Sequence, residues 1–341
     1  MTLIIKMREG INKEGIKIAA KIIKEGGLVA FPTETVYGLG ANALNAKAVK
    51  RIFEVKKRPA DNPLIVHIAD FEQIYELAKE VPSKAKLLAK KFWPGPLTIV
   101  LPKKENVPKI TTGYLETVAI RMPCHEIALE LIKESNLPIA APSANISGKP
   151  SATCAEHVIE DFYGKIECII DGGPTSIGVE STIIDITTEP PILLRPGGIS
   201  KEEIEKVIGE IKIHPSVKGE EANMAKAPGM KYKHYAPNAE VIVIEGKKEN
   251  VIKKIKELLR EYKNKGIKVG VIATSDFYEA DAYFNLGNSK KEIAKNLFKA
   301  LRELDKKGVE IILAEGIDEK GLGLAIMNRL KKASGHKIIK V

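Results

Sequence analysis

The last hundred residues of the chain alternate between strand-like and helix-like patterns, joined by short connections. Strand-like runs occupy 239–245, 268–274, 283–287, 309–315 and 337–341. Apolar residues at helical spacing occupy 249–264, 289–305 and 321–334. Strands that alternate with helices form parallel sheets, because the helical crossovers return the chain to the same edge. This pattern predicts a Rossmann-like parallel α/β domain over residues 240–341.

The first two hundred residues show a less regular mixture of the same patterns. The strand-like runs lie at 28–32, 64–69, 97–102, 118–123, 137–142, 167–172, 181–186 and 192–197. Helices are predicted at 11–26, 44–57, 125–134, 153–161 and 200–208, and two further helical patches follow the run 64–69 and end near Trp93. Many strands with irregularly placed helices predict an α/β fold built on a twisted mixed sheet. With 341 residues, we expect two domains, at 1–208 and 240–341, with 209–239 as a linker.

Composition narrows the class of protein. The net charge of +10 favours anionic partners such as nucleotides or RNA, although a charge excess alone is more typical of a lysine-rich solvated surface. Cys124, Cys154 and Cys168 show no CxxC spacing, so they indicate neither a zinc site nor a redox pair, and they fit a reducing cytosol. No signal peptide and no membrane-spanning run is recognisable, so we expect a cytoplasmic protein. A single glutamine beside abundant Lys, Glu and Ile resembles proteins from hot environments.

Common nucleotide and metal motifs are missing from the sequence. It contains no P-loop, no HExxH, no EF-hand loop and no GxSxG. The partial GxG at 321–323 is more typical of a tight turn into a helix. We therefore predict no metal site made by the protein.

Polar loops follow or precede several predicted strands of the first domain. They are PTETVYGLG (32–40), KKRPADNPL (56–64), APSANISGKPSAT (141–153) and VESTIID (179–185). Taken singly, each loop fits an ordinary cap, turn or solvated helix end. Taken together, they are basic and rich in hydroxyl groups, and sites in α/β sheets form at strand ends. This set predicts electrostatic stabilisation of a phosphate-bearing reaction.

Two groups of cations stand out within this set. Arg121 lies in the otherwise apolar run 118–123, so it needs an anionic partner, and a carboxylate held by two hydrogen bonds suits it. Lys56 and Arg58 precede Pro59 on a stiffened loop, which suits phosphate because less entropy is lost on binding.

Seven motifs, in this order, resemble the YrdC-like family of L-threonylcarbamoyladenylate synthases over roughly residues 10–208. They are PTETVYGLGANA, KKRPADNPL, FWPGPLT, IRMP, APSANISG, VESTIID and LRPG. The run PGMKYKHYAP and the second α/β domain look like the long, two-domain form of that family. The resemblance implies a nucleotidyltransferase that joins L-threonine, bicarbonate (or CO2) and ATP into threonylcarbamoyl-AMP and pyrophosphate, with Mg2+ on the phosphates. It also implies a downstream tRNA threonylcarbamoyl transferase complex, which would modify the adenosine beside the anticodon.

The resemblance further implies which residues form the site. Around threonine it implies Thr35, His67, Arg121, Ala141 and Ser181. Around ATP it implies Arg58, Asn62, Thr117, Ser143, Ser151 and Arg195. The polar set expected to act on phosphate and carbamate is Lys56, Arg58, Ser143 and Asn145. We also expect the segment 227–237 to act as a lid over the active site, with His234 and Tyr235 on ATP.

Two other classes of protein stay open. A tRNA- or double-stranded-RNA-binding module without catalysis would use the positive charge, but it needs a wide basic face, often with exposed stacking rings. Only 5% of this chain is aromatic, and its notable cations sit in rigid loops. An amino-acid-sensing regulatory protein would need a ligand in the second domain.

Overall fold

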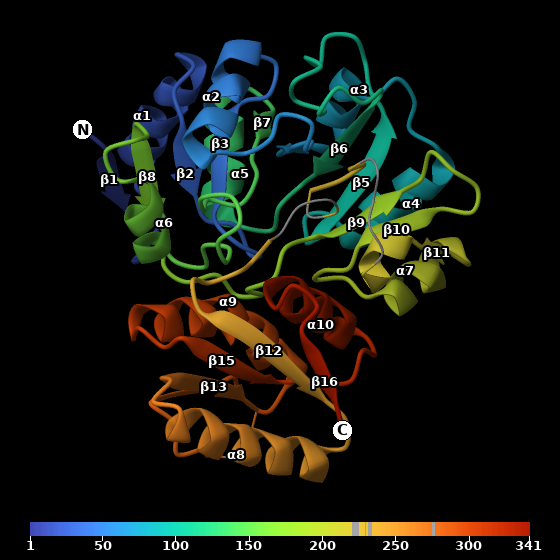
Figure 1. Cartoon of the computed structure of the whole chain (residues 1–341). Helices are drawn as coiled ribbons and strands as arrows, with labels where there is room; N and C mark the ends of the chain where they lie inside the picture. The colour runs from blue at the N-terminus through green and yellow to red at the C-terminus, as the bar shows by residue number, and fades with distance from the viewer. Residues whose placement is uncertain (220–224, 229, 231–233, 275–276) are drawn as a thin grey trace. The chain divides into compact units, whose positions relative to one another are not determined.

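The structure is a computed structural model, described here for residues 1–219, 225–228, 230, 234–274 and 277–341. The chain divides into two compact units (Figure 1). The first comprises Met1–Ser147 and Ser151–Lys231, and the second comprises Gly148–Pro150 and Tyr232–Val341. The boundary falls inside the predicted linker 209–239, and most of that segment belongs to the first unit.

The first unit is built on a mixed sheet. Within the described residues its strand order is β1-β8-β2-β3-β7-β4-β6-β5-β9-β10-β11. The strands are β1 (Leu3–Lys6), β2 (Val29–Phe31), β3 (Gly38–Asn42), β4 (Ile65–His67), β5 (Leu97–Pro102), β6 (Thr117–Arg121), β7 (Ile139–Ala140), β8 (Cys168–Asp171), β9 (Thr182–Asp185), β10 (Ile192–Arg195) and β11 (Lys212–Ile213). Strands β4 and β6 are parallel, whereas β5 and β6 are antiparallel, so the predicted mixed sheet is confirmed.

The helices of the first unit follow the predicted apolar spacing. They are α1 (Lys13–Lys24), α2 (Ala46–Lys56), α3 (Ile74–Leu77), α4 (Ser83–Phe92), α5 (Glu126–Ser135), α6 (Ala155–Phe162) and α7 (Lys201–Ile208), with 3-10 turns η1 (Phe71–Gln73) and η2 (Pro215–Lys218). Helix α1 buries Ile16, Ala19 and Ile23 along one face, and the Asn12 side chain caps its first turn. That face packs with α5 in one hydrophobic core against the sheet.

Three strands were not predicted: β1, β3 and β11. Strand β3 has the sequence GLGAN, in which glycine lowers the strand propensity. Glycine is needed there because an added Cβ at Gly40 would lie 2.7 Å from Phe31 Cε1 and 2.8 Å from Ile139 Cγ2. Strand β11 lies in the predicted linker and pairs with β10, so this part of the linker extends the first sheet.

The second unit has the predicted parallel sheet. The order is β14-β13-β15-β12-β16, and every pairing is parallel. The elements are β12 (Glu240–Glu245), α8 (Lys248–Asn264), β13 (Val269–Ala273), β14 (Ala282–Asn285), α9 (Lys290–Lys306), β15 (Ile311–Glu315), α10 (Leu322–Ala333) and β16 (Ile338–Lys340). Figure 1 shows α8 on one face of this sheet and α9 and α10 on the other. The crossover helices therefore cover both faces, as a parallel sheet requires.

Gly197 supports the loop that enters β9, and its replacement tests this packing. A Cβ at Gly197 would lie 2.3 Å from Glu180 O, Ser181 C and Thr182 N, so backbone atoms would have to move. We expect Gly197→Ala to lower the free energy of unfolding by about 3 kcal/mol or more. Gly164→Ala is the control: it has a φ of +80° but no atom within 4 Å of the added Cβ, so only the backbone penalty of about 1 kcal/mol applies. If urea denaturation shows the same loss of unfolding free energy in Gly197→Ala and Gly164→Ala, the packing argument is wrong.

Candidate functional site

Five neighbouring strands of the first sheet, β4, β5, β6, β9 and β10, have one end on the same side of the sheet. This row of strand ends is called the sheet edge below. Strands β4 and β6 are parallel and end at the register partners His67 and Arg121. Strand β5 is antiparallel to β6, and β9 is parallel to β5, so both begin at this edge. Strand β10 is antiparallel to β9 and ends here with Arg195. Ser181, directly before β9, joins them, so four predicted site residues from distant segments share one edge.

Arg121 is the centre of this edge and is only 3% exposed. Its Nη1 donates to Thr35 Oγ1 at 3.0 Å, and its Nε donates to the Gly95 carbonyl at 3.2 Å. Its Nη2 lies 2.6 Å from Glu34 Oε1, in an ion pair buried on both sides. The structure thus brings the predicted residues Thr35 and Arg121 into contact and adds a carboxylate that the sequence analysis did not name.

Glu34 could have been found from the sequence. It stands next to Thr35 in the quoted motif PTETVYGLG, and a cation inside an apolar strand needs a counter-charge. From the sequence alone, the carboxylate of the substrate is the expected counter-charge. In the structure the protein itself supplies one counter-charge to Arg121.

His67 is a neutral group beside Arg121. Burial, with a further effect of the Arg121 charge, lowers the pKa of His67 to about 3. The imidazole is therefore uncharged at neutral pH, where it can donate one hydrogen bond and accept another. The Phe31 ring meets it edge to face, with the two ring centroids 6.3 Å apart.

Ser181 links the predicted threonine residues to a predicted ATP residue. Its Oγ lies 2.8 Å from Thr98 Oγ1. Nη2 of Arg195 donates to Ser181 O at 3.0 Å and to Ser181 Oγ at 3.2 Å. Nη1 of Arg195 donates to the Pro228 carbonyl at 3.4 Å, so the start of the predicted lid segment contacts this edge.

Lys56 organises the loop after β7. It ends α2 and is only 1% exposed. Its Nζ donates to the Ser143 carbonyl at 2.6 Å and to the Asn145 carbonyl. Ala141 N donates to Ile65 O at 2.9 Å, which ties the start of this loop to β4. Three members of the predicted polar set are thereby brought together.

The remaining predicted ATP residues are spread more widely. Arg58 donates from Nε to Asn62 O at 3.3 Å and from Nη2 to Pro63 O at 3.1 Å, which braces its own loop. Ser151 Oγ donates to Glu180 Oε1 at 2.7 Å. Thr117 begins β6 and therefore lies about 13 Å along the strand from Arg121, at the opposite end. The structure does not bring Thr117 to the edge that holds Arg121.

Buried polar atoms without a hydrogen-bond partner gather in this part of the molecule. Among the residues that the structure describes, they include Glu34 Oε2, His67 Nδ1 and His125 Nδ1. Buried polar groups in folded proteins are overwhelmingly hydrogen-bonded, so such a group of exceptions needs an explanation. A polar ligand that binds among these side chains would supply the missing partners.

His234 and Tyr235 belong to the second unit. The Tyr235 ring stacks on Phe298 with centroids 5.1 Å apart, and the Arg329 guanidinium carbon lies 5.4 Å from its centroid. Tyr235 is 5% exposed, so much of its ring is used in packing. Residues 229 and 231–233 of the expected lid lie outside the described residues. The roles of His234 and Tyr235 on ATP stay predictions.

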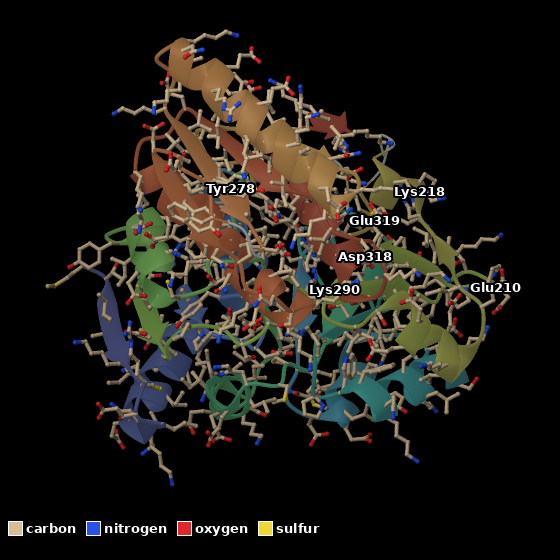
Figure 2. The ribbon with its side chains drawn as sticks, turned by 90° about the horizontal axis from the view of Figure 1, so that it is seen from below. Glu210, Lys218, Tyr278, Lys290, Asp318 and Glu319 are labelled. Carbon is tan, nitrogen blue, oxygen red and sulfur yellow. The ribbon has the colours of Figure 1, made fainter. Side chains whose placement is uncertain are left out.

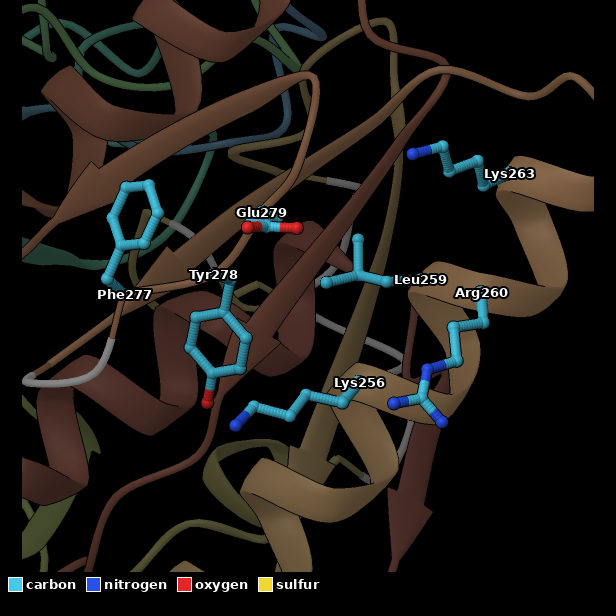
Figure 3. Close-up of a pocket in the computed structure, with 7 residues that line it drawn as sticks. All are labelled: Lys256, Leu259, Arg260, Lys263, Phe277, Tyr278 and Glu279. Atoms are coloured by element: carbon cyan, nitrogen blue, oxygen red, sulfur yellow. The ribbon is translucent and has the colours of Figure 1, made fainter.

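Among its described residues, the second unit carries several open pockets of its own, two of which are described here. One, of about 430 Å³, lies between α8 and residues 277–279 (Figure 3). Its lining residues are Lys256, Leu259, Arg260, Lys263, Phe277, Tyr278 and Glu279. The other, of about 330 Å³, lies after β12 and β15, where α8 and α10 leave the sheet on opposite faces. There Asp318 Oδ1 is 2.7 Å from Lys290 Nζ, so this acid is already paired (Figure 2).

Neither a metal centre nor a membrane segment is found in the described part of the chain. No group of three or more His, Cys, Asp or Glu residues is placed there to hold a metal ion. No helix among the same residues is long and apolar enough to cross a membrane.

The low pKa of His67 predicts how the stability of the folded chain depends on pH. In the unfolded chain His67 takes up a proton near pH 6.5, whereas in the folded chain it does so only near pH 3. The unfolded state therefore binds more protons between these values, and stability falls as the pH falls through this window. From pH 7 to pH 5, His67 alone should remove roughly 2 kcal/mol. In urea denaturation, His67→Gln should weaken this pH dependence by that amount. The exposed control His336→Gln should leave it unchanged, and an equal slope in both variants would contradict the assignment.

Comparison with known proteins places the chain in a family. A family model for Sua5, YciO and YrdC, described as "Telomere recombination", matches residues 21–197, and one described as "Threonylcarbamoyl-AMP synthase, C-terminal domain" matches residues 199–335. Threonylcarbamoyl-AMP synthase of Pyrococcus abyssi is 68% identical over the whole of both chains. That of Bacillus subtilis is 52% identical over 96% of this chain and 95% of its own. A crystal structure of P. abyssi Sua5 complexed with L-threonine superposes with a TM-score of 0.98, at 68% identity over both full chains. The chain belongs to the threonylcarbamoyl-AMP synthase family, in its two-domain form.

Proposed function

We propose that this chain makes threonylcarbamoyl-AMP and pyrophosphate from L-threonine, ATP and bicarbonate or CO2. The observation that carries the proposal is the sheet edge on which Arg121 contacts Thr35, beside the neutral His67 and near buried atoms without hydrogen-bond partners. Support also comes from the P. abyssi relative, whose structure is a complex with L-threonine.

Threonine binding needs a cation for the carboxylate and polar partners for the hydroxyl. Arg121 supplies the cation, and the two hydrogen bonds that it donates to Gly95 O and Thr35 Oγ1 already fix the guanidinium. Thr35 and Ser181 supply hydroxyl groups that can donate or accept. Ala141 closes the pocket with a small apolar side chain, which suits the methyl group of threonine.

The chemistry then brings several anions together. The ammonium group first loses a proton, and the free amine adds to CO2 with release of a second proton to give the carbamate. A carbamate oxygen then forms a bond to the α-phosphorus of ATP while the bond from that phosphorus to the β-phosphate oxygen breaks, and pyrophosphate leaves. Arg58, Lys56 and Arg195 offset the repulsion between carbamate and phosphates, and Ser143 and Asn145 position them. Mg2+ neutralises charge on the triphosphate and arrives with the nucleotide.

The product is a mixed anhydride and therefore reactive towards water. It must be consumed by an acyl-transfer enzyme, for which the family implies a tRNA threonylcarbamoyl transferase complex in the cytoplasm. The predicted lid at 227–237, with His234 and Tyr235, would protect the adenylate from hydrolysis. No observation in the structure favours the alternative of a non-catalytic RNA-binding module over this enzyme.

Pyrophosphate release tests the reaction. With ATP and Mg2+, the protein should release pyrophosphate only when both L-threonine and bicarbonate are present. Valine should support at least about 100-fold less turnover, because it leaves the hydroxyl-binding partners unpaired, whereas serine should be tolerated better. Pyrophosphate release that needs neither the amino acid nor bicarbonate would contradict the proposal.

Arg58→Ala tests the phosphate assignment. Loss of a charge-assisted interaction with ATP should lower kcat/KM for ATP by roughly 10- to 100-fold. Lys47→Ala is the matched control, since Lys47 is an exposed cation of α2 in the same unit. The assignment is wrong if both variants keep the wild-type dependence on ATP concentration.

A further inference from the structure

We propose that Glu34 binds the α-ammonium group of the amino acid substrate and so selects amino acids over hydroxy acids. This inference rests on the proposed function, because it takes threonine to bind at the sheet edge. It adds a residue to that site for which the sequence analysis found no role.

The carboxylate of Glu34 is buried and incompletely satisfied. The residue is 6% exposed, and Oε1 lies 2.6 Å from Arg121 Nη2. Its Oε2 has no hydrogen-bond partner among the residues that the structure describes. A buried carboxylate oxygen without a donor costs several kcal/mol, so a donor that arrives with the ligand would stabilise the complex.

The backbone holds Glu34 in this position independently of Arg121. The Glu34 carbonyl accepts from Ile177 N at 2.8 Å and from Ser176 Oγ at 3.3 Å. Thr35 O accepts from Gly178 N at 3.0 Å. These bonds fasten the 34–35 turn to the loop before β9 and so fix the point from which the Glu34 side chain projects towards Arg121.

The balance of charge identifies the missing donor as a cation. Arg121 and Glu34 together are neutral, and an incoming carboxylate would lie near Arg121 and therefore near Glu34, which would repel it. The α-ammonium of a zwitterionic amino acid offsets this repulsion. With the zwitterion bound, each of the four charges has opposite charges as its neighbours.

The neighbouring histidines do not supply this positive charge. The pKa of His67 is lowered to about 3, chiefly by burial. Burial also lowers the pKa of His125, although the nearby Glu34 charge acts in the opposite direction. Both rings are therefore neutral at pH 7, and the ammonium group of the substrate is the cation that complements Glu34.

Comparison of two ligands distinguishes binding of the ammonium group by Glu34 from a purely structural role of Glu34. L-threonine and 3-hydroxybutyrate share the carboxylate, the hydroxyl and the methyl group, but only threonine has the amine. Calorimetric titration should show that the wild-type protein prefers L-threonine strongly. In Glu34→Gln, affinity for L-threonine should fall by about 10- to 100-fold, while affinity for 3-hydroxybutyrate should not fall and should rise if the repulsion between its carboxylate and Glu34 is relieved. Glu34→Asp should retain part of the preference, and the exposed control Glu202→Gln should retain all of it.

Other outcomes would overturn the inference in distinguishable ways. If Glu34→Gln weakens both ligands equally, Glu34 acts only through the shape of the site or through Arg121. If Glu34→Gln fails to fold, the comparison with Glu34→Asp decides. Aspartate is one methylene shorter than glutamate, so an unchanged preference of Glu34→Asp for L-threonine over 3-hydroxybutyrate would contradict direct contact. If the wild-type protein binds no L-threonine, the proposed function fails as well.

Discussion

The buried ion pair between Arg121 and Glu34 is the interaction on which the site depends. Two charges in a dry environment are tolerated only when they are paired and hydrogen-bonded, and removal of one partner typically costs 3–5 kcal/mol. Here the pair joins the end of β6 to the loop after β2, and Arg121 also bonds Thr35 and Gly95. The pair therefore fixes three separate segments around the space in which a ligand would bind.

The other cations of the site form hydrogen bonds within the protein and are also placed to bind anionic ligands. Lys56 donates to the carbonyls of the 143–145 loop, Arg58 to those of its own loop, and Arg195 to Ser181. Each side chain is therefore held before any anion arrives. Groups that are already oriented lose little entropy on binding and need little reorganisation as charge develops, which is the physical basis of electrostatic catalysis.

Much of the fold was predictable because its signals are local. Alternating strand and helix patterns after residue 239 predicted the parallel sheet, since each crossover helix carries a clear apolar face. Strand β3 was missed because its glycines serve the close approach of Phe31 and Ile139, which depends on tertiary packing. Strand β11 was missed because a two-residue pairing leaves almost no sequence pattern.

The site was predictable only in part. Ordered motifs pointed to Thr35, His67, Arg121 and Ser181, which the structure places on or beside one sheet edge. Glu34 was overlooked because the counter-charge of Arg121 was expected from the substrate carboxylate, although Glu34 stands beside Thr35 in the same motif. The rings of 227–237 suggested ligand contacts, but Tyr235 stacks on Phe298, a packing partner 63 residues away that no local pattern reveals.

A crystal structure of this chain with L-threonine would test the central claim most directly. The account predicts the amino acid at the edge formed by β4, β6 and β9, with its carboxylate on Arg121 and its ammonium nitrogen within about 3 Å of Glu34. Threonine bound elsewhere, or bound there with its ammonium group directed away from Glu34, would contradict it.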